Sequence, residues 1–255
     1  MGLFQTLLEQ PMYNLLIGLY NVLPGADLGF AIIALTVVIK LVLWPLTNSS
    51  LKSQRAMQQL QPKLDAIKEQ HKDDKEALAK AMMELYSKEK VNPLSSCLPL
   101  LIQLPVLIAL YRVFMAGLRE DGLSMLYPFV SNPGAVNEMF LGLVDLGERS
   151  IPLAVLAGAF QFVQTKMLMV KRPPPAVRNK PGAKDEDMMA AMNKSMLYFM
   201  PVMTVAIGIS LPAGLTLYWV AVSVISVLQQ FLVFRKHPLP AQAEVKVIED
   251  VPVNK

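Results

Sequence analysis

Residues 196–234 read MLYFMPVMTVAIGISLPAGLTLYWVAVSVISVLQQFLVF and contain no charged side chain. An α-helix rises 1.5 Å per residue, so a hydrocarbon core of about 30 Å takes about 20 residues to cross. The stretch is far too long for one crossing, and its centre, residues 210–214, has the proline and glycine of a turn. It therefore predicts two short transmembrane helices, residues 196–211 and 212–234.

Three further apolar blocks each match one helical crossing: residues 28–47, 97–118 and 151–170. Charged residues make up 17% of the chain, against roughly 25% in an ordinary soluble domain. Hydrophobic residues make up 53%, and the mean hydropathy is +0.40. The sequence therefore predicts an all-α, polytopic membrane protein with five transmembrane helices.

Lysine and arginine are distributed unevenly between the polar segments. Residues 48–96 hold nine, residues 171–194 hold six, and the tail after residue 234 holds four. The first 29 residues hold none, and residues 119–150 hold two. Because basic loops stay on the cytoplasmic side, both large polar loops and the C-terminus are predicted to be cytoplasmic, with the N-terminus outside.

Residues 48–96 are predicted to form a cytoplasmic helical hairpin. Apolar residues recur at spacings of three and four between residues 57 and 67, and again between residues 78 and 85. Asp73, followed by Glu76, resembles a capping box that starts the second helix. Nine basic residues face seven acidic ones in this segment, a balance that does not indicate a nucleic-acid site.

The N-terminal residues 1–27 mix leucines with polar residues and are predicted to form an amphipathic helix on the outer membrane surface, interrupted at Pro11. The remaining segments are predicted to be an outer interfacial loop, a flexible cytoplasmic loop and a cytoplasmic tail: residues 119–150, 171–195 and 235–255.

The usual signatures of catalysis and metal binding do not occur in the sequence. Cys97 is the single cysteine, and the two histidines, His71 and His237, are far apart in polar surroundings. No predicted span contains an acidic residue or a histidine, so an intramembrane enzyme would lack a nucleophile–base pair or a metal site. We therefore expect a protein that is not an enzyme and that needs no metal or other cofactor.

Lys40 is the most informative residue, because it lies within a predicted span. It lies about 15 Å along the helix from Phe30 and about 9 Å from Leu46. A lysine at the membrane centre costs roughly 2.5–3.5 kcal/mol, which a water-filled cavity or a polar partner can offset. The alternative is that its long side chain reaches the cytoplasmic headgroups. A small anion transporter would also use such a cation, but the internal repeats typical of transporters are missing.

Polar residues in other spans are candidate neighbours for Lys40. Each alone is more often an interhelical hydrogen-bonding residue, but together with an unpaired lysine they predict a hydrated, positively charged groove. Arg112 and Lys166 lie nearer the ends of spans and are interpreted as anchors. The candidate groove residues are Lys40, Thr36, Gln103, Gln161, Gln164 and Ser223, with Gln229 and Gln230 as further polar groups and Tyr218 and Trp219 as walls or simple packing residues.

Several stretches resemble one known family. These are VVIKLVLWPLT (37–47), the run from LQPKLDAIKEQ to PLLIQLPVLIALY (60–111), FLGLVDLGERSIPL (140–153) and FMPVMTVAIGISLPAGLTLYWVAVSVISVLQQFL (199–232). They are similar to the YidC membrane insertases, which are related to mitochondrial oxidase-assembly and chloroplast insertases. The resemblance extends over residues 28–235, the whole predicted five-span core.

The resemblance implies a membrane protein insertase and chaperone of the bacterial inner membrane, with nascent membrane proteins and the lipid bilayer as partners. Family members have a hydrophilic groove that opens to the cytoplasm and to lipid, with an arginine at the position of Lys40. Gln164, Trp219 and Thr36 match groove positions of the family. Participation of the Sec translocon or the ribosome stays open, although the tail, with four basic and three acidic residues, does not favour ribosome docking.

Overall fold

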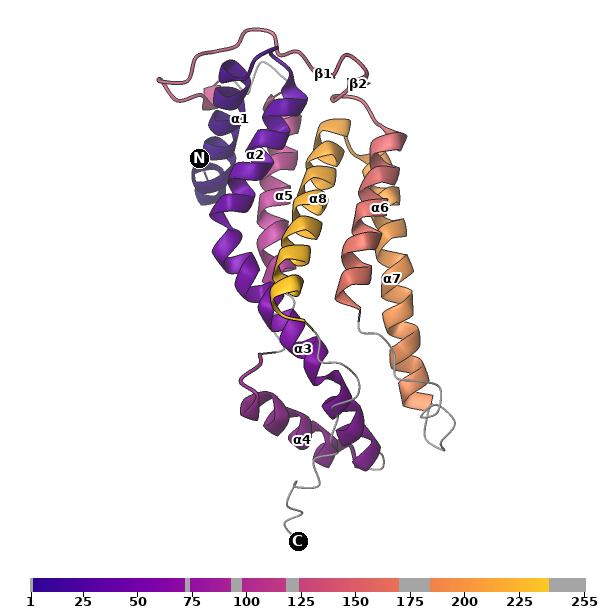
Figure 1. Cartoon of the computed structure of the whole chain (residues 1–255). Helices are drawn as coiled ribbons and strands as arrows, with labels where there is room; N and C mark the ends of the chain where they lie inside the picture. The colour runs from indigo at the N-terminus through magenta and orange to yellow at the C-terminus, as the bar shows by residue number, and fades with distance from the viewer. Residues whose placement is uncertain (1, 72–73, 93–97, 118–123, 170–183, 239–255) are drawn as a thin grey trace.

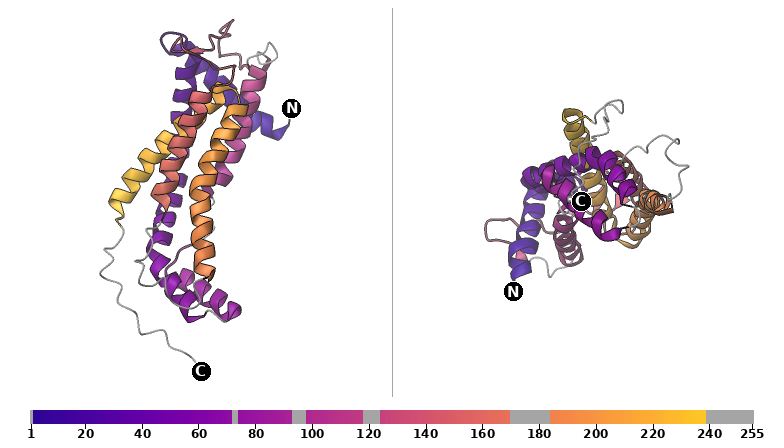
Figure 2. Two further views of the ribbon diagram at one scale, coloured as in Figure 1. Left: turned by 90° about the vertical axis from the view of Figure 1, so that its right-hand side faces the viewer. Right: turned by 90° about the horizontal axis from the view of Figure 1, so that it is seen from below.

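The computed structural model describes residues 2–71, 74–92, 98–117, 124–169 and 184–238, and these form an almost entirely helical protein. Five helices run alongside one another as an elongated bundle (Figure 1; Figure 2 gives two further views). This arrangement confirms the predicted all-α fold class. The helices of the bundle are α2 (Leu28–Val42), α5 (Leu98–Gly117), α6 (Ile151–Leu168), α7 (Lys184–Ser210) and α8 (Ala213–Lys236).

The two ends of the bundle carry different structures. Helices α3 (Trp44–Gln70) and α4 (Lys75–Lys88) lie at one end, which we call the hairpin end (Figure 1). Residues 124–150 cover the opposite end, which we call the loop end. This loop contains a short antiparallel ladder of β1 (Met139–Phe140) and β2 (Val144–Asp145), which the sequence analysis did not predict.

The first predicted span is bent in the structure. Helix α2 ends at Val42, and α3 begins two residues later at an angle of 67° to it. Pro45 lies in the first turn of α3, where its missing N–H is tolerated, and it disfavours a helical conformation for the residue before it. The 15 residues of α2 rise only about 22 Å, so crossing a membrane would also take the first turns of α3.

The number of spans stays a prediction. Among the described residues, α6 and α8 are each long and apolar enough to cross a membrane, and the bent pair of α2 and α3 also qualifies if it is one span. Helices α5 and α7 contribute shorter apolar stretches, Leu101–Met115 and Leu197–Ser210. The turn predicted within residues 210–214 is confirmed, since α7 ends at Ser210 and α8 begins at Ala213.

The N-terminal segment forms a continuous helix, so the predicted interruption at Pro11 is wrong. A π-helical turn, η1 (Gln5–Glu9), leads directly into α1 (Gln10–Val22), and Pro11 lies in the first turn of α1. A π-turn is wider than an α-helical turn, and this one lies just before Pro11. In a regular α-helix the ring of Pro11 would clash with the carbonyl group four residues earlier. Helix α1 also packs against α2 and α5, at the side of the five-helix bundle.

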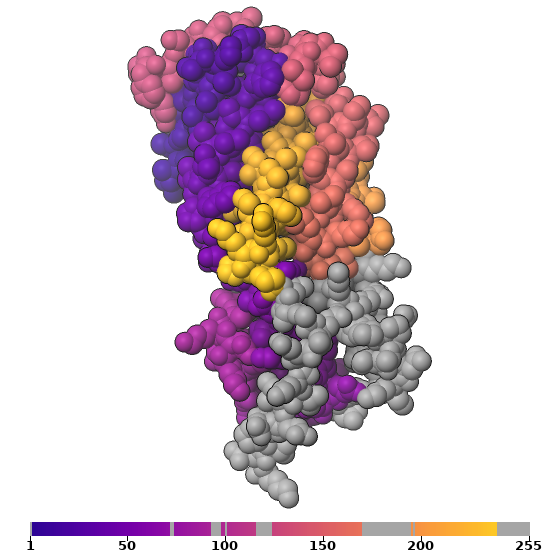
Figure 3. Space-filling view, viewed as in Figure 1, coloured from indigo at the N-terminus to yellow at the C-terminus, as the bar shows by residue number. Residues whose placement is uncertain are grey.

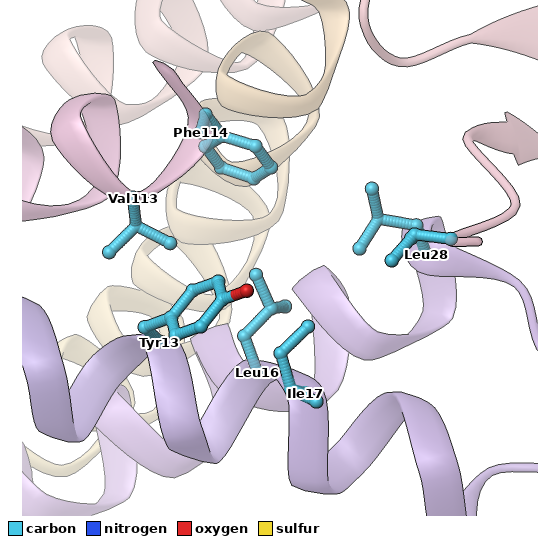
Figure 4. Close-up of a pocket in the computed structure, with 7 residues that line it drawn as sticks. Tyr13, Leu16, Ile17, Leu28, Val113 and Phe114 are labelled. Carbon is cyan, nitrogen blue, oxygen red and sulfur yellow. The ribbon is translucent and has the colours of Figure 1, made fainter. Parts of the chain in front are cut away.

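Side chains from α1, α2 and α5 form the core near the loop end. Tyr13, Leu16 and Ile17 of α1 meet Leu28 of α2 and the α5 residues around Val113 (Figure 4). The apolar void between them has a volume of about 10 Å³, at most room for about one water molecule. This part of the protein is therefore close-packed and holds α1 firmly on the bundle.

Helices α6 and α7 approach closely because small residues line their contact. A Cβ atom built at Gly158 would lie 2.4 Å from the Val205 side chain and 3.1 Å from the Pro201 carbonyl oxygen. A Cβ atom at Gly208 would lie 3.0 Å from Ala154. Such small residues let helix backbones approach in a membrane, where packing rather than the hydrophobic effect holds helices together.

Two predicted boundaries at the hairpin end are wrong. Helix α7 begins at Lys184, so the predicted flexible loop 171–195 is helical from residue 184 onward, where alanine and methionine favour helix; residues 170–183 lie outside the described part. The N-cap of α4 is Asp74, whose side chain accepts from the N–H groups of Glu76 and Ala77. The predicted cap, Asp73, lies outside the described residues.

Candidate functional site

Helix α8 carries a stripe of polar side chains through the middle of the bundle. Its members, Ser223, Ser226, Gln229 and Gln230, are all buried and lie on one side of the helix, at spacings of three, four and seven residues. We call this set the polar stripe. Figure 3 shows α8 lying in the seam between α2 and α6 on one face of the molecule.

Lys40 of α2 binds the polar stripe directly. Its Nζ donates a hydrogen bond of 2.7 Å to Ser226 Oγ, and that hydroxyl donates onward to the carbonyl oxygen of Val222, also at 2.7 Å. The lysine side chain is 9% exposed, so it does not extend to the surface of the protein. In the described part of the chain, no carboxylate lies within ion-pair distance of it.

The position of Lys40 in α2 helps to stabilise its charge. Lys40 lies in the last turn of the helix, where the carbonyl groups without intrahelical partners create a partial negative charge. The helix C-terminus and one hydroxyl acceptor therefore solvate the ammonium without supplying a full negative charge.

Two more polar groups lie toward the hairpin end of the stripe. Gln229 Nε2 donates to Thr47 Oγ1 of α3 at 2.9 Å, which ties α8 to the first turn of α3. Gln230 is 1% exposed, and among the described residues its Oε1 has no hydrogen-bond donor. A buried acceptor without a donor is costly, so this atom is a natural site for water or for a donor from another chain.

The structure brings part of the predicted groove set together. Thr36 lies one turn before Lys40 and is fully buried, but its hydroxyl donates to the carbonyl of Ile32 on its own helix, at 2.7 Å. Gln103 of α5 donates to the Tyr218 hydroxyl of α8 at 2.7 Å. Thr36 therefore makes no hydrogen bond to Lys40 here, while Gln103 and Tyr218 join α5 to α8.

The other predicted residues lie around the same helix. Ser223 is buried within the polar stripe, and Trp219, one turn before it, is half-buried. Gln161 and Gln164 lie half-buried on α6, which packs against α8. Helix α6 lies on the opposite side of α8 from α2 (Figure 3).

The loop end closes over the first turn of α8. The backbone N–H of Ala213 donates to the Glu148 carbonyl at 2.6 Å, and that of Gly214 donates to the Leu146 carbonyl at 2.8 Å. A Cβ atom at Gly214 would lie 2.9 Å from the Phe114 ring, so only glycine fits here without a shift. The unpaired donors of this helix end are thereby satisfied by the loop.

The two predicted anchors have aromatic contacts, and one has an ion pair. Arg112 of α5 pairs with Glu9 of η1 at 2.7 Å, and its guanidinium lies 5.3 Å from the centre of the Phe4 ring. The ammonium of Lys166 lies 5.9 Å from the centre of the Phe162 ring on its own helix. Arg112 thus fastens the N-terminal helix to α5, a role that the sequence analysis did not predict.

Ser226 and Thr47 are the site residues that the sequence analysis missed. Ser226 follows Ser223 by three residues and precedes Gln229 and Gln230, so helical spacing already placed it among predicted polar groups. Thr47 was not recognised as a site residue because it was predicted to be the last residue of a straight first span. The bend after Val42 is what turns it back toward α8.

The site is made of one cation and neutral hydrogen-bonding groups. It offers one ammonium group and several hydroxyl and amide groups. Among the described residues, no group of three or more His, Cys, Asp or Glu side chains could hold a metal ion. Such a set can attract and solvate an acidic or polar segment of another molecule.

Comparison with known proteins relates the chain to one family. A profile of the family described as 60Kd inner membrane protein matches residues 18–240. The protein named Membrane protein insertase YidC from Fusobacterium nucleatum is 36% identical over 210 residues, which are 82% of this chain and 87% of that protein. The proteins of the same name from Ectopseudomonas mendocina and Francisella tularensis subsp. novicida are 34% and 37% identical.

The aligned regions cover 91% and 82% of this chain but only 35% and 33% of the last two relatives, so the chain spans about a third of their length. Among solved structures, the one titled "Active YidC insertase crystal structure with the first transmembrane domain resolved" superposes with a TM-score of 0.56 and 23% identity. The match covers 89% of this chain and 46% of that one. The superposition supports the same fold.

Proposed function

Because the chain belongs to the 60Kd inner membrane protein family, we propose that it is a membrane protein insertase and chaperone, the activity for which its curated relatives are named. It would guide nascent membrane proteins into the lipid bilayer of the bacterial inner membrane. The proposal requires neither a chemical reaction nor a cofactor. The partners would be the unfolded substrate segment and the surrounding lipid.

Lys40 is the observation that carries the proposed mechanism. It is a buried cation whose only described side-chain partner is the neutral hydroxyl of Ser226. A cation without a carboxylate partner in a medium of low dielectric constant attracts an anionic group strongly. An acidic segment of a substrate is the natural anion to reach it from the membrane interior.

The route for the substrate follows the seam that contains α8. Its polar segment would pass along the polar stripe, where water, Gln230 Oε1 and the α6 glutamines Gln161 and Gln164 can solvate it. Its apolar segment would slide along the lipid-facing sides of α2, α6 and α8, and transfer of that segment into lipid would drive the movement. In the conformation described here the stripe is covered, so substrate binding must open the seam and form the groove.

The proposed orientation of the protein in the membrane follows from its basic loops. With the hairpin end in the cytoplasm, the substrate would arrive beside α3 and α4, and the loop end would seal the outer side through the Ala213 and Gly214 hydrogen bonds. A lysine here lacks the bidentate fork of an arginine. The site should therefore hold carboxylates less specifically than a family member with arginine. Contact with a Sec translocon or a ribosome would be additional to this route.

Photo-crosslinking to a stalled nascent chain tests this function. A photoreactive residue is placed at Trp219 or Gln164 of the protein in proteoliposomes, and ribosomes supply a short membrane protein with an acidic outer segment. Both positions should crosslink to the substrate, and liposomes without the protein should leave it uninserted. A photoreactive residue at Leu7, which is exposed on η1 away from the seam, is the matched control. Crosslinks from Leu7 alone, or equal insertion into empty liposomes, would refute the proposal.

A further inference from the structure

We infer that one turn of α3 acts as a clasp that holds α6 and α8 together at the hairpin end and must open before a substrate reaches the polar stripe. The clasp consists of Arg55 and Gln58, supported by Gln59. It regulates the site described above, so this inference rests on the proposed insertase function. Its action is purely conformational and involves no chemical step.

The clasp binds the C-terminal end of α8 through Arg55. The guanidinium Nε donates to the carbonyl of His237, which caps α8, at 2.8 Å, and its carbon lies 4.6 Å from the centre of the Phe234 ring. Gln59 Nε2 donates to the next carbonyl, that of Pro238, at 3.2 Å. A cation at a helix C-terminus satisfies unpaired carbonyl groups and interacts favourably with the helix dipole.

The same turn of α3 binds the C-terminal end of α6 through Gln58. Its side-chain amide donates to the carbonyl groups of Met167 and Leu168, and its Oε1 accepts a hydrogen bond of 2.7 Å from Arg55 Nη1. Gln58 is 6% exposed, so these bonds are shielded from water, which would otherwise compete for them. Arg55 and Gln58 therefore form one connected network between the ends of two bundle helices.

The arrangement of the helices gives this network a mechanical consequence. Helix α8 separates α2 from α6 in the seam, and α3 is the continuation of α2 beyond its 67° bend (Figures 1 and 3). Arg55 binds α8 and Gln58 binds α6, and because these two side chains of α3 are hydrogen-bonded to each other, together they fix the width of the seam at the hairpin end. The buried state of Lys40 and Gln230 is consistent with a closed seam. Breaking the clasp frees the ends of α6 and α8 to separate.

A labelling experiment measures the opening directly. Ser223→Cys in a Cys97→Ser background places one thiol in the buried stripe, and an impermeant thiol reagent is added from the hairpin side. Arg55→Ala or Gln58→Leu should raise the labelling rate about tenfold. This change corresponds to a loss of about 1.4 kcal/mol in the free energy that favours the closed seam. Lys52→Ala, a change at an exposed lysine on the same helix, is the matched control and should leave the rate unchanged. Equal rates in the clasp variants and the control would overturn the clasp.

A reversible lock tests whether opening is required for insertion. Gln58→Cys and Leu168→Cys are joined by a short thiol crosslinker that a reductant cleaves, with Gln61→Cys and Asp65→Cys, both within α3, as the matched control pair. Crosslinking of the clasp pair should abolish insertion, and cleavage by the reductant should restore it. The protein with the crosslinked control pair should insert the substrate throughout. Full insertion by the locked protein would overturn the inference. Failure of the unmodified protein to insert any substrate would instead refute the proposed function, and the labelling result would still report on the clasp.

Discussion

The hydrogen bond between Lys40 and Ser226 shows how a cation is kept inside the bundle without an acid. The ammonium combines one hydroxyl acceptor with the C-terminal end of α2, and the hydroxyl is held in place by its own bond to the Val222 carbonyl. This arrangement leaves the positive charge largely uncompensated. The residue can therefore attract a carboxylate from another chain.

A double-mutant cycle with Lys40→Met and Ser226→Ala measures this contact. Removing the acceptor of a buried, charge-assisted bond costs about 1.5–3 kcal/mol, so Ser226→Ala should destabilise the protein by that amount with Lys40 present and far less with methionine there. Unfolding in lipid nanodiscs gives the coupling energy. The cycle of Lys40→Met with Ser223→Ala is the control, and equal coupling in both cycles would show that the contact is not specific.

Sequence reasoning identified Lys40 but not its partner. The charge stood out because a charged side chain deep in an apolar block is costly, whereas Arg112 and Lys166 lie nearer the ends of their predicted spans. Ser226 did not stand out, because a serine in a membrane helix is ordinary until a specific neighbour faces it. Thr36 shows the converse: helical spacing placed it correctly beside Lys40, but its hydroxyl found a nearer acceptor in the Ile32 carbonyl of its own helix.

At the scale of helices, the contact between α6 and α7 depends on glycine residues at the points of closest approach. Gly158→Ala should destabilise the protein even though alanine favours helix, because the new methyl group would meet Val205 and the Pro201 carbonyl. Gly18→Ala in α1 is the matched control, since no atom lies within 4 Å of its added Cβ. It should stabilise the protein by up to about 1 kcal/mol. The unfolding temperatures of the two variants are compared with that of the wild type. A higher unfolding temperature in both variants would contradict the packing argument.

The positions of helices could be predicted where a long apolar stretch or a turn containing proline and glycine sets the boundaries. They were predicted less well elsewhere. The break between α7 and α8 follows from proline and glycine in an uncharged run, and the structure places it where the sequence predicted. The bend between α2 and α3 was missed because Pro45 lies near the end of the apolar block, where it was included in the first span and not interpreted as a break. The start of α7 at Lys184 was missed because charge was interpreted as loop, although residues 184–194 contain good helix formers.

At the scale of the whole molecule, the loop end and the hairpin end are built differently. The loop end is held by backbone hydrogen bonds and packed side chains, as at Gly214 and in the small void beside Tyr13. The hairpin end is held by the side chains of Arg55 and Gln58. An end held by side chains is the easier one to open, which suits the proposed arrival of the substrate from that side.

The stability of the loop end should depend on pH through Glu138. Burial, and secondly the charge of Asp145, raise the pKa of the Glu138 carboxyl above its ordinary value of 4.5. The folded state thus binds the proton more tightly than the unfolded state, and the ionised carboxylate destabilises the fold at neutral pH. Glu138→Gln should therefore raise the unfolding temperature at pH 7, and the advantage should shrink as the pH falls through the raised pKa and toward 4.5.

Thermal unfolding of both proteins across that pH range checks this prediction. Glu148→Gln, which removes an exposed carboxylate from the same loop, is the control for the loss of one negative charge. A constant difference between Glu138→Gln and the wild type at every pH would mean that the carboxylate is not penalised by its surroundings.

Insertion by charge-reversed protein tests most directly whether the cation at position 40 draws substrates into the membrane. Wild type and Lys40→Glu are reconstituted in liposomes and given two versions of one single-span substrate, whose short outer segment is acidic in one and basic in the other. The wild type should insert the acidic version faster, and Lys40→Glu should reverse that order. The same preference for the acidic version in both proteins would contradict the account.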